Sequence, residues 1–179
     1  VGAERGRWPW PRDVLAEAIA TIAEARPRAL FVNVIFSEAD PAHPDADRAL
    51  QEVAAAYPFI VHPFVRLPPG NDRYSRLDAS RLPNARPLAG RGVVPDPVAV
   101  VLPAFADLQR NLGAANLYQD DDGIIRSYVY WLHTDAHALP SAATAMLLAA
   151  RAEAPPSGDG LLPRLNWRNK RGDYLRVSF

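Results

Sequence analysis

Four polar side chains lie in or directly after the first strongly apolar run of the sequence, ALFVNVIF at 29–36. They are Asn33 within the run, and Ser37, Glu38 and Asp40 in the loop that follows it. In open α/β sheets, ligands bind in the crevice beyond the carboxyl ends of the strands. Glu38 and Asp40 alternate along an extended loop, so both carboxylates are placed to face one ligand or cation. The alternative is that these side chains cap the amino end of a helix predicted over 44–57.

A second candidate site combines aromatic rings and cations near the amino end of the sequence. Trp8 and Trp10 lie between Arg7 and Arg12. Guanidinium groups bind the faces of indole rings, so this pattern is suited to a ligand clamp. The alternative is that the indoles cover the core while the arginines bind backbone carbonyls, because tryptophan buries a large apolar area.

The acidic run at residues 120–122 precedes a glycine, and Asp120 and Asp122 are the candidate metal ligands within it. Carboxylates suit calcium, but the full calcium-loop pattern with its distant glutamate does not follow. Asp-Gly between β-prone runs is instead a strong signal for a hairpin turn. We expect a turn, with Arg126 paired to one of these carboxylates.

His133 and His137 have a spacing that would share a metal on a helix, yet they precede Pro140 in a segment predicted to be a loop. The sequence carries no cysteine, so a thiolate zinc site and a cysteine nucleophile are excluded. No nucleophile elbow, phosphate-cradling glycine loop or dinucleotide fingerprint is present. We therefore expect no catalysis, no cofactor and no dedicated metal site.

These candidate groups need a folded body to position them, and the composition is compatible with one. The sequence has 179 residues, of which 49% are hydrophobic, and this is enough for a single sizeable core. Its 20 basic and 20 acidic residues cancel, which argues against a nucleic-acid binder and against charge-driven membrane binding. No run approaches the ~18 apolar residues that span a bilayer. The 18 prolines predict long irregular stretches.

Hydrophobic periodicity predicts alternating helices and strands. Apolar rows predict a helix over 12–25, the run 29–36 reads as a strand buried on both faces, and a helix over 44–57 leads to a strand at 59–65. Pro63 cannot donate to a ladder, which predicts that the later half of that strand lies at a sheet edge or leaves the sheet. The alternation predicts an α/β fold with a parallel pair of strands.

The second half is less regular. Residues 66–98 are rich in proline and hold six arginines, which predicts an extended irregular excursion: a solvated loop on the body or, alternatively, a binding surface. Pro103 begins a short predicted helix, an alanine-rich helix follows Pro140, and 164–179 reads as a hairpin. The predicted fold is a three-layer αβα domain over 1–179, with a central mixed sheet, a long Pro/Arg-rich insertion and a C-terminal hairpin.

An ordered set of segments resembles one bacterial family. The segments are GRWPWPR at 6–12, ALFVNVIFSEAD at 29–40, GAANLYQDDDGIIR at 113–126, LPSAA at 139–143, and the C-terminal LNWR and YLRVSF. In this order they resemble the type-two CHASE domain, the second class of cyclase/histidine-kinase-associated sensory extracellular domains. The resemblance covers nearly the whole sequence. Asn33 stands where the family often has aspartate, and Gln119 where it often has proline.

The resemblance implies an extracytoplasmic sensory domain of a bacterial membrane receptor, with flanking transmembrane helices and a cytoplasmic cyclase or kinase output. It also implies a hydrophobic strand before Trp8, which we expect this sequence to lack. The expected ligand is an unknown small molecule or ion, with no nucleic-acid partner. The candidate ligand-binding residues are Trp8, Trp10, Arg12, Asn33, Ser37, Glu38, Asp40, Asn116 and Arg126. The alternative function is a structural or dimerisation module of such a receptor, acting as a homodimer without direct ligand binding.

Overall fold

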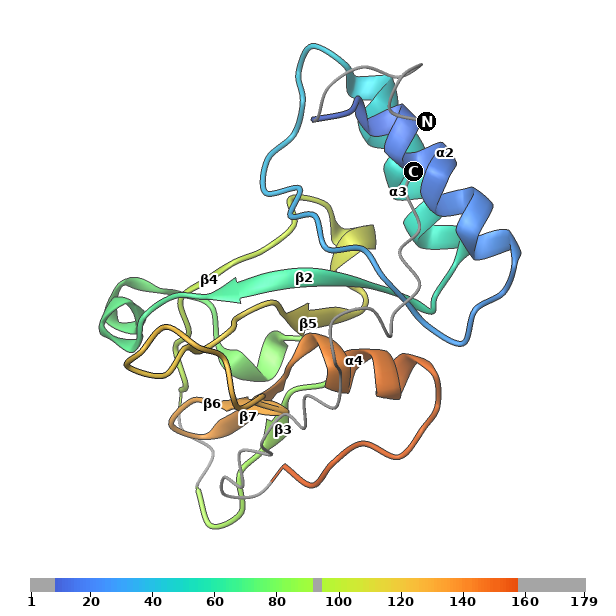
Figure 1. Ribbon diagram of the computed structural model, residues 1–179. Helices are drawn as coiled ribbons and strands as arrows, with labels where there is room; N and C mark the ends of the chain where they lie inside the picture. Colours follow the sequence, from blue (N-terminus) through green and yellow to red (C-terminus); the bar gives the residue numbers. More distant parts are fainter. Residues whose placement is uncertain (1–8, 92–94, 158–179) are drawn as a thin grey trace.

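The computed structural model describes residues 9–91 and 95–157 and shows an α/β fold around a mixed sheet (Figure 1). Strand β2 (Ile60–Arg66) is central: it pairs in parallel with β1 (Leu30–Phe31) and β5 (Leu112–Ala114), and antiparallel with β4 (Val100–Val101). A smaller antiparallel sheet contains β3 (Arg86–Pro87), β7 (His137–Pro140) and β6 (Trp131–His133), in that order. A parallel bridge between Ala114 and Ser141 joins β5 to the chain after β7. The predicted parallel pair is thus confirmed.

Helices cover both faces of the larger sheet, as the α/β prediction required. Helices α2 (Arg12–Glu24) and α3 (Pro44–Ala56) pack against each other and enclose one core with Ile60 of β2. Helix α4 (Ala142–Ala149) packs against β5 and β2 from the opposite side, because Gly113 of β5 faces it. Alternate residues of a strand point to opposite faces, so β2 contributes to both layers. Figure 1 shows α2 and α3 together on one side of β2 and α4 on the other.

The small residues of α4 let its backbone approach the sheet closely. A Cβ atom placed on Gly113 would lie 2.6 Å from the Cα of Ala142 and 3.0 Å from the Cβ of Ala145. Ser141 begins the helix, and its side chain accepts a hydrogen bond from the amide of Thr144. The alanine-rich helix predicted after Pro140 is confirmed, and its small side chains permit this close approach.

Pro63 does not end the strand. The prediction that the later half of this strand lies at a sheet edge or leaves the sheet was wrong, since residues 62–66 pair with β5 and β4. Its neighbours His62 and Phe64 bond toward β5: the His62 amide donates to the Asn111 carbonyl, and the Phe64 carbonyl accepts from the Ala115 amide. The backbone nitrogen of Pro63, which has no hydrogen to donate, therefore faces the side of β2 away from β5. There β1 has ended and the pairing with β4 has not begun. The strand continues to Arg66 because no ladder bond is required at that position.

The first strand is shorter than predicted. Strand β1 covers only Leu30–Phe31, and both residues are half-buried, so the prediction of a long strand over 29–36 buried on both faces was wrong. The chain leaves the ladder after the Val32 amide donates to the Val61 carbonyl, and Asn33 is exposed. The Phe36 side chain returns to the core between α2 and α3.

The Pro/Arg-rich segment over 66–98 contains two 3-10 turns, η1 (Pro69–Tyr74) and η2 (Ala79–Arg81), and strand β3. It buries three apolar side chains, which join Phe64 and Leu139 in a second core: Ala79, Leu82 and Val98. The fold is therefore built partly from this segment. A further 3-10 turn, η3 (Ala106–Gln109), stands where a short helix after Pro103 was predicted.

The turn at Asp120–Gly123 is confirmed: the Gly123 amide donates to the Asp120 carbonyl at 2.8 Å, and Gly123 has φ +78°. No strand flanks it within 115–130, so a regular hairpin does not form there. The hairpin predicted at 164–179 and the strand expected before Trp8 lie outside the described residues. None of the helices in the described ranges is long and apolar enough to cross a membrane.

Candidate functional site

Arg12 connects the first helix, the loop after β1 and the second helix. Its guanidinium forms an ion pair with Asp47 of α3 and donates to the Glu38 carbonyl at 2.8 Å. It also lies over the ring of Phe36, 5.6 Å from the centroid. Asp47 is buried, and its second carboxylate oxygen accepts from the Asp40 amide at 2.7 Å. Two of the predicted site residues, Arg12 and Asp40, therefore bind a carboxylate that was not among the candidates, and Glu38 joins them only through its carbonyl.

The Glu38 and Asp40 side chains do not cap α3. The residue before α3 is His43, which makes no side-chain capping bond, so that alternative was wrong. The Asp40 carboxylate instead accepts from the ring of His43 at 3.0 Å and from the Ala42 amide at 3.1 Å. These bonds, with the His43 ring first, lower the pKa of Asp40. Asp40 thus closes its own loop, since the carboxylate stabilises the turn that leads into α3.

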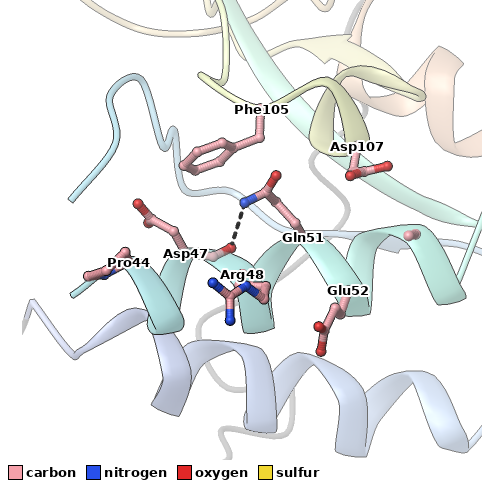
Figure 2. A pocket seen from close by; sticks show the side chains of 8 residues that line it. Pro44, Asp47, Arg48, Gln51, Glu52, Phe105 and Asp107 are labelled. Carbon is pink, nitrogen blue, oxygen red and sulfur yellow. Dashed lines mark hydrogen bonds between the residues drawn. The ribbon is translucent and has the colours of Figure 1, made fainter. Parts of the chain in front are cut away.

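A groove of about 510 Å³ lies between α3 and the turn η3 (Figure 2). We call it the α3 groove; its lining residues are Pro44, Asp47, Arg48, Gln51, Glu52, Ala55, Phe105 and Asp107. Figure 2 shows the Gln51 side chain lying between the α3 backbone and Phe105. Most of its charged groups are already paired: Asp47 with Arg12, Arg48 with Asp45, and Asp107 with Arg110. These pairings leave little charge to recognise a ligand.

A second groove, of about 580 Å³, opens between the end of β2 and the β6 strand. We call it the Trp131 groove. Its lining residues are Arg66, Leu67, Pro68, Pro69, Asn116, Tyr118, Val129, Trp131, Leu132 and His133. Three separate stretches of sequence form this surface, and aromatic and apolar side chains dominate it. Such a lining with a few polar groups is typical of small-molecule sites, which commonly measure about 300–1,000 Å³.

Arg66 is the charged anchor of the Trp131 groove, and it is neutralised within the protein. Its two terminal nitrogens bind the two oxygens of Asp72 at 2.7 and 2.5 Å, and one of them also donates to the carbonyls of Leu67 and Ala99. The guanidinium side chain is only 7% exposed. Burial acts to raise the pKa of Asp72, but the bonds from Arg66 and from the Ala99 amide lower it overall. Such a two-pronged pair fixes the position of the guanidinium group.

Asn116 and Tyr118 form one wall of the groove. The Asn116 side chain pairs with the backbone of Arg66 in both directions, accepting from its amide at 2.8 Å and donating to its carbonyl at 2.9 Å. This pairing substitutes for a strand partner and holds the 115–118 segment against the end of β2. Tyr118 is half-exposed; partial burial raises its pKa, although the charge of Arg66 opposes this. Of the predicted ligand-binding residues, Asn116 is the one that lines this groove.

Two other lining residues, Trp131 and His133, contact the chain that follows α4. The indole nitrogen of Trp131 donates to the Pro155 carbonyl at 2.8 Å, and Nε2 of His133 lies 3.2 Å from the Ser157 carbonyl. Arg86 packs on the Trp131 ring at 4.6 Å from its centroid. The groove wall and the segment 155–157 are therefore physically linked.

The remaining predicted residues do not converge on either groove. Ser37, like Asn33, is exposed, Trp10 precedes α2, and Trp8 lies outside the described residues. Arg126 pairs with both Asp120 and Asp122, at 2.9 and 2.7 Å, which confirms the predicted pairing. These two carboxylates, the candidate metal ligands, thus already have a cation. Within 9–91 and 95–157, no three histidine or acidic side chains converge to hold a metal.

The structure also shows a buried polar cluster that the sequence did not reveal. Asp96 is 2% exposed; its carboxylate accepts from the Thr134 hydroxyl at 2.5 Å and from the Ala136 amide at 3.1 Å, and lies 2.8 Å from Nδ1 of His137. Burial acts to raise the pKa of Asp96, but these bonds lower it overall. The predicted loop position of His133 and His137 was wrong, since both lie in strands. The cluster fixes the β6–β7 turn, which positions one wall of the Trp131 groove.

His62 is a further unpredicted feature. Its ring is buried at the centre of β2, and neither ring nitrogen has a hydrogen-bond partner among the described residues. Burial lowers its pKa from 6.5 to about 4. For a single histidine in an apolar run, the sequence does not show whether the ring is exposed or buried.

Comparisons with known proteins support one assignment. Neither the curated proteins nor the solved structures that were compared include a significant match. The family model of the CHASE2 domain matches residues 2–179. This match covers all of the residues that the structure describes. The chain therefore belongs to the CHASE2 family of extracellular sensory domains.

Proposed function

We propose that this chain is the ligand-binding, extracytoplasmic part of a bacterial transmembrane receptor whose output is a cyclase or a kinase. Membership of a family of extracellular sensory domains supports the signalling role. The observation that carries the ligand-binding role is the Trp131 groove. It has the volume and the lining of a small-molecule site, and its polar groups are held in place by Asp72 and Asn116.

Ligand binding would act by shifting a population between two arrangements of the domain. Trp131 and His133 line the groove and also contact the carbonyls of Pro155 and Ser157. A ligand that prefers one position of these side chains therefore also prefers one position of the segment 155–157. These contacts link the groove directly to the segment 155–157 after α4.

Calorimetric titration of the domain with a broad panel of small metabolites tests this proposal. We expect saturable binding by at least one compound, and we expect His133→Trp, which fills the exposed rim of the groove, to abolish it. His43→Trp is the matched control, because His43 is exposed and lies outside the Trp131 groove. No response across the panel, or binding that survives His133→Trp, would contradict ligand sensing at this groove.

A dimerisation module is the second candidate function, and one observation favours it. Three of the five large hydrophobic side chains that are exposed in the described ranges lie in the segment 117–124: Leu117, Tyr118 and Ile124. Clustered exposed apolar groups often mark an interaction surface. Sedimentation velocity separates the two candidates: a stable dimer that Leu117→Asp dissociates, together with a silent metabolite panel, would favour the module.

A further inference from the structure

We propose that the ligand of the Trp131 groove is an uncharged aromatic small molecule that carries a hydrogen-bond donor such as a hydroxyl or an N–H group. This inference rests on the proposed function and adds the chemical class of the ligand. Three properties of the groove lead to it: its charge balance, the shape of its apolar walls, and its exposed polar atoms.

The charge balance argues against ionic ligands. Arg66 and His133 are the two basic residues of the lining, and the lining contains no aspartate or glutamate. Asp72 already neutralises Arg66 with two short hydrogen bonds. A cation would therefore find no carboxylate in the groove, and an anion would have to compete with Asp72. A charge transferred from water without a partner is strongly unfavourable, so the groove discriminates against both signs.

The walls favour a flat, apolar body. Pro68 and Pro69 are among the lining residues, and the aromatic residues of the lining are Tyr118, which is exposed, and Trp131, whose buried ring carries Arg86 on one face. Proline rings and the faces of aromatic side chains pack well against planar molecules, and aromatic pairs gain about 0.5–1.5 kcal/mol beyond the burial of area. The volume of about 580 Å³ accommodates one such molecule of two or three fused or linked rings.

The exposed polar atoms select a donor on the ligand. A carbonyl oxygen only accepts, so the contact with Ser157 requires that Nε2 of His133 donates. In the neutral ring, Nδ1 is then an acceptor, and His133 is an exposed residue of the lining. The Tyr118 hydroxyl makes no hydrogen bond to the described residues and can accept or donate. The Asn116 side chain, by contrast, is already occupied by the backbone of Arg66.

Three indoles of closely similar shape and different charge test the proposal: indole-3-ethanol, which is neutral, indole-3-acetate and tryptamine. Each is titrated into ¹⁵N-labelled protein, and the indole N–H signal of Trp131 is followed. We expect a saturable shift with indole-3-ethanol, with an affinity at least about fivefold higher than for either charged compound. Tyr118→Ala should weaken that binding by about five- to tenfold.

Tyr74→Ala is the matched control, because Tyr74 is also an exposed tyrosine but does not line the groove. It should leave the affinity for indole-3-ethanol unchanged. The proposal is overturned if a charged indole binds as tightly as the neutral one, if Tyr118→Ala and Tyr74→Ala behave alike, or if no indole binds. A metabolite panel that yields a charged ligand at this groove would overturn the ligand class while leaving the sensing function intact.

Discussion

Replacement of the buried His62 by leucine should change how the stability of the domain depends on pH. The ring of His62 is 2% exposed, and no described residue bonds to either of its nitrogens. The folded state therefore holds the ring neutral, and burial lowers its pKa to about 4. In the unfolded chain the same ring takes up a proton near pH 6.5.

The sign of the effect follows from proton binding. Between pH 6.5 and about 4 the unfolded state binds more protons than the folded state, so the free energy of unfolding falls as the pH falls. The contribution of the neutral His62 ring to the free energy of unfolding is fully present above pH 6.5 and is lost by about pH 4. The difference between the two pKa values corresponds to a loss of about 3 kcal/mol across this interval. Below it the contribution of His62 no longer changes.

Urea unfolding at half-unit steps between pH 4 and 8 measures this directly. We expect wild-type protein to lose about 3 kcal/mol more than His62→Leu over the interval, and the variant to be no less stable at pH 8, because it removes an unpaired polar group. His133→Leu is the control, since His133 is exposed. Parallel pH profiles for wild type and His62→Leu would refute the reasoning.

Two further predictions concern the packing that positions the grooves, and urea unfolding measures both. Gly113→Ala forces a Cβ against the backbone of α4 and should destabilise the fold by about 1–3 kcal/mol. Gly70→Ala, where nothing lies within 4 Å, should change stability by less than about 1 kcal/mol, and equal effects would contradict the close approach. Arg12→Ala leaves the buried Asp47 without its cation and should cost about 3 kcal/mol. Arg48→Ala removes only an exposed ion pair and should lower the free energy of unfolding by less than about 1 kcal/mol. If both variants lost similar stability, the buried pair of Arg12 with Asp47 would not stabilise the fold more than an exposed pair does.

Local patterns predicted the regular elements well. The helices expected over 12–25 and 44–57 are observed as Arg12–Glu24 and Pro44–Ala56, and the strand expected at 59–65 as Ile60–Arg66. Helical periodicity and proline at helix starts are properties of neighbouring residues, so no distant contact is needed to read them. Strand length was less predictable. The apolar run over 29–36 forms only a two-residue strand, because the next position of β2 that faces it, Pro63, has no amide to continue the ladder.

The sites were harder to predict because they depend on distant partners. Arg12, Glu38 and Asp40 were selected as candidates for a ligand, yet two of them bind Asp47, 35 and 7 residues away, and the third offers Arg12 its carbonyl. The sequence does not distinguish a carboxylate that is free to bind a ligand from one that is paired with an arginine in the folded protein. The prediction about the strand at Pro63 was wrong for a similar reason. Only the placement of β1 and β4 shows that the Pro63 nitrogen faces the space between these two strands, where no ladder bond is needed.

The amino-acid sequence alone determined the family, the α/β class and the positions of the main helices, since each of these is expressed in short, ordered segments. Only the tertiary structure decided where a small molecule could bind. The Trp131 groove joins stretches around residues 66–69, 116–118 and 129–133, which meet because β2, β5 and the β6–β7 sheet pack together. Long-range packing sets that convergence, and local preferences along the chain do not encode it.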